Sequence, residues 1–180
     1  MINSLRLVTD QDLTPFTRVQ AQLCKEMTRK DGLSIPIAKS DLNAGLLAYE
    51  LPTWEGTKEP ERLDILGYDK KDHSLIAFEI KRPGCGGVEL ENLFSQGMEH
   101  RNWLEENKMA VKLTLDGPKG KRINTRKRVR LILGFFSEQV PALFYELRSE
   151  AQKKDRHLGI DFVQFRVDSN GVLTLSQFEK

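Results

Sequence analysis

The stretch "RLDILGYDKKDHSLIAFEIKRP", residues 62–83, contains two apolar runs joined by a short polar link. This pattern predicts two strands, over 62–69 and 74–81, that form a hairpin with its tip at residues 71 and 72. Such a hairpin pairs Asp64 with Glu79, and alternation along the strand places Lys81 on the same face as Glu79. The sequence therefore predicts two carboxylates and one ammonium group together at one end of otherwise apolar strands.

Charged groups in this position need an explanation, because an ionised carboxylate that is buried without a partner costs several kcal/mol. A salt-bridge cluster at the edge of a sheet is one explanation, in which Lys81 relieves part of the repulsion between Asp64 and Glu79. The other is a divalent cation that bridges both acids, and oxygen-rich sites of this kind suit Mg²⁺ or Mn²⁺. Taken alone, a Glu-x-Lys tripeptide favours the salt-bridge cluster.

The remaining elements predict an α/β domain over residues 1–180. A first helix should begin at Pro15, with Thr14 as its N-cap and Gly32 as a stop signal. Its apolar stripe consists of Phe16, Val19, Leu23 and Met27. We further expect a strand over 46–51, a helix over 88–106, a strand over 129–136, a helix capped by Ser137, and a C-terminal hairpin of strands over 160–167 and 172–178. The order is helix, three strands, helix, strand, helix, two strands, which predicts a mixed sheet flanked by helices.

Composition is typical of a soluble cytoplasmic protein. The 180 residues include 39% hydrophobic and 30% charged side chains, enough for a single domain with its own core. No apolar run approaches the roughly 20 residues of a membrane-spanning helix, and the N-terminal residues lack a secretory apolar stretch. Cys24 and Cys85 are far apart and have no metal-ligand spacing. Because no apolar run is long enough to span a membrane, we expect no membrane partner.

Positive charge is concentrated in "KGKRINTRKRVR", residues 119–130, which contains no acid. Its basic residues are Lys119, Lys121, Arg122, Arg126, Lys127, Arg128 and Arg130. The net charge of the chain is only +2 and does not by itself imply a nucleic-acid partner. The segment is either a solvated loop or an arm that contacts phosphates.

The segments "RLDIL" and "LIAFEIK" resemble the core of the PD-(D/E)XK nuclease superfamily, which has the restriction-endonuclease-like fold. The order of elements in that core, a helix, a three-stranded meander, a helix and a further strand, matches residues 13–136. The resemblance implies that Asp64 and Glu79 bind Mg²⁺, or Mn²⁺, and that Lys81 is the catalytic lysine. It also implies the backbone carbonyl of Ile80 as a further ligand. Leu63 stands where the family name has proline.

The same resemblance implies further site residues. Many members add a glutamate to the metal site, which here is either Glu26 on the first helix or Glu50 on the preceding strand. Some branches carry Gln-x-x-x-Tyr on the helix after the motif, where Gln96 and His100 stand in this chain. Gln96 is then expected near the metal site as a catalytic residue, and His100 is expected to contact a phosphate or a base. Each of these four side chains has an alternative as an ordinary surface or helix-boundary residue.

These observations predict a metal-dependent nuclease that hydrolyses phosphodiester bonds of nucleic acid, with DNA as the expected substrate. The alternative is a nuclease-fold module with little or no hydrolysis that binds nucleic acid or a protein partner. A third reading is an unrelated α/β protein whose acids form a surface network. The intact set of Asp64, Glu79 and Lys81 favours the enzyme.

Overall fold

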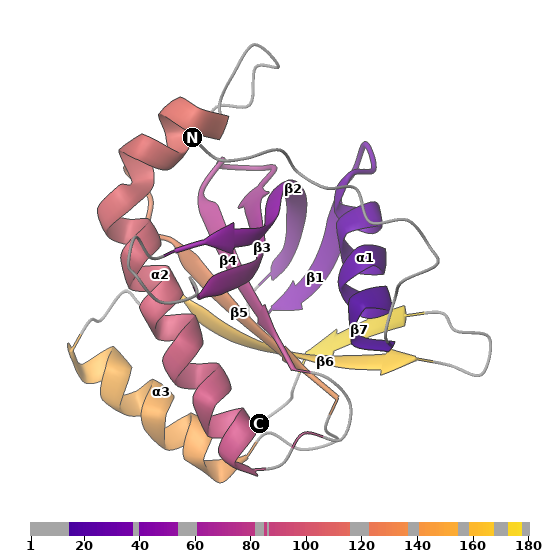
Figure 1. Cartoon of the computed structure of the whole chain (residues 1–180), viewed down its shortest axis with the longest axis vertical. Helices are drawn as coiled ribbons and strands as arrows, with labels where there is room; N and C mark the ends of the chain where they lie inside the picture. The colour runs from indigo at the N-terminus through magenta and orange to yellow at the C-terminus, as the bar shows by residue number, and fades with distance from the viewer. Residues whose placement is uncertain are drawn as a thin grey trace.

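The computed structural model describes residues 15–37, 40–53, 61–81, 85, 87–115, 123–136, 141–154, 159–167 and 173–177. Within these ranges the chain forms three helices and seven strands (Figure 1). The elements are α1 (Pro15–Met27), β1 (Leu33–Ile37), β2 (Ser40–Pro52), β3 (Arg62–Asp69), β4 (Leu75–Ile80), α2 (Gly87–Leu115), β5 (Arg130–Phe135), α3 (Ala142–Lys154), β6 (Ile160–Val167) and β7 (Leu173–Gln177). No helix in the described part is long and apolar enough to cross a membrane.

All seven strands belong to one mixed sheet, in which the spatial order follows the order along the chain. Strands β1 to β4 pair antiparallel, β4 pairs parallel with β5 and β5 with β6, and β7 returns antiparallel to β6. Parallel neighbours need a crossover connection, and α2 and α3 occupy the two crossovers. The sheet curls until β1 contacts β6 and β7, so it is nearly closed.

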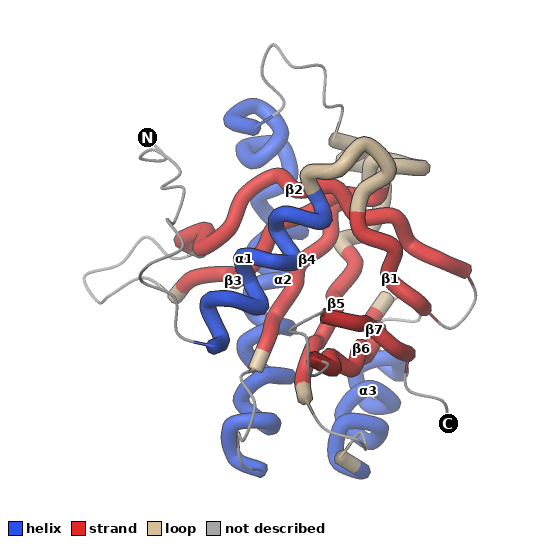
Figure 2. Tube along the Cα trace, turned by 90° about the vertical axis from the view of Figure 1, so that its right-hand side faces the viewer, coloured by secondary structure: helices blue, strands red, loops and turns tan. Residues whose placement is uncertain are grey.

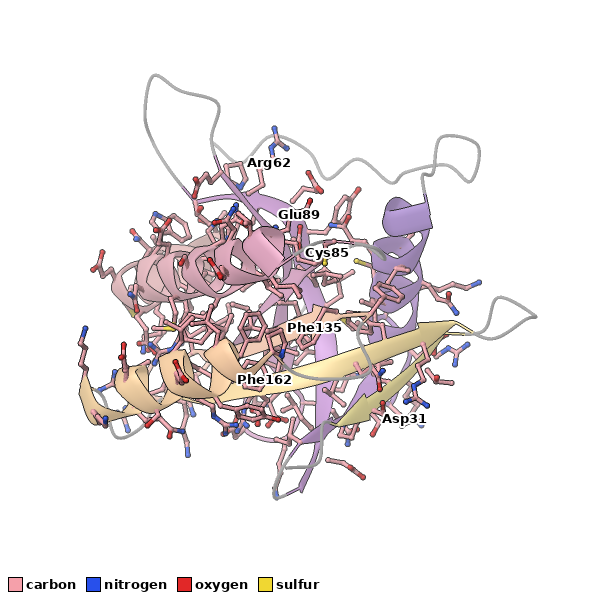
Figure 3. The ribbon with its side chains drawn as sticks, turned by 90° about the horizontal axis from the view of Figure 1, so that it is seen from below. Asp31, Arg62, Cys85, Glu89, Phe135 and Phe162 are labelled. Atoms are coloured by element: carbon pink, nitrogen blue, oxygen red, sulfur yellow. The ribbon has the colours of Figure 1, made fainter. Side chains whose placement is uncertain are left out.

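The two faces of the sheet are covered by different helices. Figures 1 and 2 show α1 on one side of the strands, and α2 with α3 on the other. Alternate side chains along β3, β4 and β5 supply the two cores. Ile65, Ile76, Phe78 and Ile132 pack with α1, whereas Leu66, Ala77, Leu131 and Leu133 pack with α2 and α3. The aromatic rings of Phe135 and Phe162 belong to this second core, between α3 and the sheet (Figure 3).

The predicted hairpin is confirmed together with its register. Leu66 pairs with Ala77 and Tyr68 pairs with Leu75, as the tip at residues 71 and 72 requires. The first helix also begins at Pro15 as predicted, and the part of its stripe whose side chains are described, Val19, Leu23 and Met27, is buried. Gly32 adopts a φ of 78°, a conformation that favours glycine after a helix. Thr14 lies outside the described residues.

One strand was not predicted from the sequence. The segment "LSIPI" forms β1, so four strands, rather than three, separate α1 from α2. Proline in a short apolar run argues against a central strand, but Pro36 is tolerated because β1 lies at the end of the strand order. Strand β2 is also longer than predicted and begins at Ser40, since exposed Asp41 and Asn43 alternate with buried neighbours.

The helices differ from the prediction mainly at their ends. Helix α2 continues to Leu115 instead of ending near residue 106, because Val111 adds a buried side chain two turns beyond Leu104. Helix α3 begins at Ala142, with Phe144 as its buried anchor. The predicted cap Ser137 and the predicted turn at residues 169–171 lie outside the described residues.

Close packing of α2 on the sheet depends on Gly97. A Cβ atom at this position would lie 2.8 Å from Cδ2 of Leu133 and 3.1 Å from Cδ1 of Leu131. Both leucines are fully buried, so they have little room to move. Glycine at this position therefore lets the helix approach β5 closely enough for its neighbouring side chains to reach the end of β4.

Replacing Gly97 with valine is expected to destabilise the protein by about 1–3 kcal/mol through overpacking. Valine has the better helix propensity, so propensity alone predicts the opposite sign. Urea unfolding monitored by circular dichroism measures the difference, with Ser95→Val on the exposed side of α2 as the control. Equal stability of the two variants would show that α2 does not need a glycine at this contact.

Candidate active site

Three neighbouring strands contribute one carboxylate each to a row across the sheet. The ladder between β3 and β4 is paired up to Ile65 and Phe78, and its register continues to Asp64 opposite Glu79. In the ladder between β2 and β3, Glu50 stands between the two pairs that flank Asp64. The row therefore runs Glu50, Asp64, Glu79, and it places like charges on adjacent strands.

Six of the predicted site residues line one pocket of about 300 Å³ at this end of the sheet. Asp64, Ile80, Glu79 and Lys81 reach it from the strands, and Gln96 and His100 reach it from α2. Glu61, Arg62 and Glu89 complete the lining, and Figure 3 shows Arg62 and Glu89 beside the start of α2. The hairpin and the helix that follows it thus bring these six predicted site residues together.

Asp64 is the electrostatically strained member of the row. Burial, together with the negative charges of Glu79 and Glu50, raises the pKa of its carboxyl group from 3.8 to about 8. The backbone N–H of Ile80, which donates to Oδ2 at 2.7 Å, and the ammonium group of Lys81 lower the pKa in part. In the metal-free protein Asp64 therefore holds a proton more tightly than a free carboxyl group does, and this proton reduces the repulsion among the acids.

Lys81 is held at both its backbone and its side chain. Its backbone N–H donates to the carbonyl of Gly134 at 2.9 Å, which continues the pairing of β4 with β5 by one residue. Its Nζ donates to Oε1 of Gln96, also at 2.9 Å. An ammonium group has three donors, so two remain for other partners in the pocket.

His100 lines the pocket but is almost completely buried, with 3% of the residue exposed. The contact with a phosphate or a base that the resemblance implied stays a prediction. Its Nδ1 hydrogen-bonds to Oε1 of Glu79, which is itself 4% exposed. The imidazole is therefore a hydrogen-bond partner of the Glu79 carboxylate.

Neither candidate for a third acid lines the pocket. Glu26 pairs with Arg29 on the surface of α1 at 2.5 Å and does not line the pocket. Glu50 lies close enough to Asp64 for its charge to raise the pKa of that group. Its backbone has a φ of 51°, which is unusual for a residue other than glycine. Of the two, Glu50 is the one whose charge raises the pKa of Asp64, and a role for either acid in a metal site stays a prediction.

Gln20 of α1 was not singled out from the sequence. It is buried, and its Nε2 donates to the backbone carbonyl of Asp64 at 2.9 Å and to Oε1 of Glu50 at 3.4 Å. The signal for Gln20 in the sequence was its position as a polar residue directly after Val19 of the apolar stripe. The helix on the opposite face of the sheet thus also supports the row of acids.

The donor set fits Mg²⁺ in its chemical character. Mg²⁺ usually keeps several waters and binds through one or two carboxylates, which Asp64 and Glu79 could supply. Within the described residues, no group of three or more His, Cys, Asp or Glu side chains is arranged to hold a metal ion. The raised pKa of Asp64 is the observation that bears on a metal, because a divalent cation would relieve the same repulsion from Glu79 and Glu50 that the proton relieves.

The basic segment does not lie beside this pocket. Arg126, Lys127 and Arg128 are exposed and precede β5, whose first residue, Arg130, pairs with Ile76 near the start of β4. The acids lie toward the other end of β4, where Glu79 is three residues beyond Ile76, or about 10 Å further along the sheet at 3.3 Å per residue. Lys119, Lys121 and Arg122 lie outside the described residues.

The described part of this segment is fastened to α2. The backbone N–H of Val129 donates to Glu105 at 2.5 Å, and its carbonyl accepts from Nε of Arg101 at 3.1 Å. Lys108 donates to the carbonyl of Lys127 at 3.0 Å. These bonds hold the backbone in place while the side chains of Arg126, Lys127 and Arg128 stay exposed.

Comparisons with known proteins leave the family open. No protein-family model and no curated protein matches the chain. Among solved structures, an FdxN element excision controlling factor from Anabaena variabilis aligns over 87% of this chain and 96% of its own, with 13% identity and a TM-score of 0.33. SfsA from Pyrococcus furiosus, solved in complex with Ca²⁺, aligns over 74% of this chain and 53% of its own, with 15% identity and a TM-score of 0.34. At these TM-scores neither likeness carries a conclusion about function.

The raised pKa of Asp64 predicts how the stability of the metal-free protein depends on pH. Because the folded state holds this proton more tightly than the unfolded state, the contribution to stability is complete below about pH 4 and is lost as the pH rises to about 8. Asp64→Asn, which stays neutral, should flatten this decline. Thermal unfolding in EDTA across this range tests the prediction, with Asp41→Asn on the exposed side of β2 as the control. An unchanged decline in Asp64→Asn would contradict it.

Proposed function

We propose that the protein is a metal-dependent nuclease that hydrolyses phosphodiester bonds, with DNA as its substrate. The observation that carries this proposal is the convergence of Asp64, Glu79 and Lys81 on one pocket, in the register expected from the hairpin. Two carboxylates and a lysine in this arrangement supply the charges that phosphodiester hydrolysis needs.

The arrangement of elements is compatible with a restriction-endonuclease-like core. Helix α1, strands β2 to β4, helix α2 and strand β5 follow in the order that the sequence resemblance implies. The meander is antiparallel and β5 joins β4 in parallel, with α1 and α2 on opposite faces. On this proposal β1 is an added edge strand, and α3, β6 and β7 extend the far side of the sheet.

In this mechanism Asp64 and Glu79 would hold Mg²⁺, or Mn²⁺, and the carbonyl of Ile80 and the side chain of Glu50 would be further oxygen donors. The bound cation supplies a Lewis acid for the phosphoryl oxygen and lowers the pKa of a bound water. The row of carboxylates is costly without a cation, so the sheet presents a site whose charge is complementary to one. Gln20 keeps Asp64 and Glu50 in place from the opposite face.

Lys81 acts on the substrate. Gln96 orients its ammonium group from one side, and the remaining N–H donors face a phosphate that enters the pocket. There they orient the attacking water and stabilise the negative charge that develops on phosphorus oxygens in the transition state. A neutral side chain at this position would leave that charge uncompensated.

A nuclease-fold module that only binds nucleic acid is the second candidate. It is favoured by the lack of a three-ligand metal group among the described residues. The two candidates differ in their products. Labelled single-stranded, double-stranded and branched DNA, incubated with Mg²⁺ or Mn²⁺ and with an EDTA control, should be cleaved by the enzyme and left intact by the binding module.

Substitutions in the pocket separate chemistry from binding. Asp64→Asn is expected to abolish cleavage, and Lys81→Ala should lower the single-turnover rate by at least about 10²-fold with little change in DNA affinity. Lys25→Ala, on the exposed surface of α1, is the charge-matched control. Wild-type cleavage by Asp64→Asn would exclude this carboxylate as a metal ligand and would remove the basis of the mechanism.

The basic segment is expected to contribute affinity without chemistry. If Arg126, Lys127 and Arg128 contact phosphates, replacing all three with alanine should reduce the salt dependence of DNA binding by up to about three units of slope. The single-turnover rate at saturating DNA should change little, because the segment lies at the other end of the sheet. Fluorescence anisotropy at several salt concentrations measures the slope.

The matched control for this triple variant replaces three exposed lysines elsewhere on the surface, Lys25, Lys153 and Lys154, with alanine. Both variants lose the same net charge, so a general electrostatic effect would weaken both equally. An unchanged slope in the Arg126, Lys127 and Arg128 variant would identify the segment as a solvated loop and would direct the search for the DNA path to another surface, such as that around Arg62.

A further inference from the structure

His100 is a buried titratable side chain that the proposed mechanism does not yet use. It is 3% exposed, and it joins α2 to β4 through the hydrogen bond between its Nδ1 and Oε1 of Glu79. Its other ring nitrogen, Nε2, is buried and has no hydrogen-bond partner in the described part of the chain. Such an asymmetric environment indicates which nitrogen carries the proton.

An ionised carboxylate can only accept hydrogen bonds, so Nδ1 must be the donor when Glu79 is charged. The neutral imidazole then has a bare lone pair at Nε2. A buried acceptor without a partner is tolerated more often than a buried N–H group without one. Both ring positions therefore favour the neutral tautomer with its proton on Nδ1.

This hydrogen bond restricts Glu79. It ties one carboxylate oxygen to a helix that Gly97 seats firmly on the sheet, and it leaves the other oxygen available to the pocket. One helical turn earlier, Gln96 holds the ammonium group of Lys81 in the same way. Helix α2 thus orients both charged residues of the motif strand β4.

We propose that His100 is a positioning residue, which donates from Nδ1 to Glu79 and orients that carboxylate for a divalent cation. This inference rests on the proposed function, because Glu79 is a ligand only if the pocket binds a metal. Partners that orient a metal ligand in this way typically change metal affinity by about 10- to 100-fold.

Three substitutions test the role of the Nδ1 donor. His100→Leu removes the donor at similar volume, His100→Asn places an amide N–H near the position of Nδ1, and His100→Gln extends the amide toward the position of Nε2. Asn92→Leu, on the exposed surface of α2, is the control for a change from a polar residue to leucine. Isothermal titration calorimetry with Mn²⁺ gives the dissociation constant of each variant, and circular dichroism confirms folding.

His100→Leu is expected to weaken Mn²⁺ binding by about 10- to 100-fold, and His100→Asn should recover most of the affinity. Saturating Mn²⁺ should restore much of the single-turnover rate of His100→Leu, since the residue acts through the affinity of Glu79 for the cation. Wild-type affinity in His100→Leu, or equal losses in folded His100→Leu and His100→Asn, would overturn the proposal. If His100→Leu does not fold, tighter binding by His100→Asn than by His100→Gln supports it, and equal binding overturns it.

A spectroscopic measurement separates this inference from the proposed function. In the metal-free protein, ¹⁵N chemical shifts should show a protonated Nδ1 and an unprotonated Nε2 for His100, and Glu79→Gln should change the Nδ1 signal. A proton on Nε2 would overturn the positioning role even in an active nuclease. A wild-type protein that neither binds Mn²⁺ nor cleaves DNA would reject the proposed function, whereas the tautomer would still report whether His100 orients Glu79.

Discussion

The antiparallel pairing of β3 with β4 determines the position of the charged groups in the pocket. Apolar pairs such as Leu66 with Ala77 hold the two strands in register, and both of these side chains are fully buried. The same register forces Asp64 and Glu79 together, although their repulsion amounts to a few kcal/mol at an effective dielectric constant of about 20. Burial of a single large apolar side chain contributes about 1.5–3 kcal/mol, so the many buried residues of the hairpin outweigh this repulsion. The core thus imposes a charge arrangement that is unfavourable by itself.

A geometric match between α2 and β4 completes the site. Four residues of a helix rise by about 6 Å, and two residues of a strand span nearly the same distance. Gln96 and His100 are four apart on α2, and they reach Lys81 and Glu79, which are two apart on β4. The contacts run in opposite directions along the two elements, so the helix and the strand lie antiparallel. Only a closely packed helix can make both bonds, which explains the place of Gly97 between the two side chains.

Parallel pairing of β4 with β5 separates the acids from the basic segment. Glu79 lies near the C-terminal end of β4, and Asp64 lies opposite it on β3. In contrast, Arg126, Lys127 and Arg128 precede the N-terminal end of β5. A ligand that contacted both regions would have to extend along the sheet for at least about 10 Å, which corresponds to roughly three nucleotides at 3.4 Å each. The bonds from Arg101, Glu105 and Lys108 to the backbone before β5 make this separation a fixed feature of the fold.

Local patterns in the sequence determined the hairpin, its register, the start of α1 and the identity of the charged residues at the end of β4. These features depend on neighbours within a few residues, namely strand alternation, a short turn and an apolar helical stripe. Tertiary structure decided what the sequence left open. The burial of His100 against Glu79, the support of Asp64 by Gln20, and the proximity of Glu50 to Asp64 all join residues at least 14 positions apart. The edge position that admits Pro36 to β1 and the distance of the basic segment from the pocket likewise follow from the order and direction of strands in the sheet. Such contacts depend on how separate elements pack against one another, and the pattern within any one element does not contain that information.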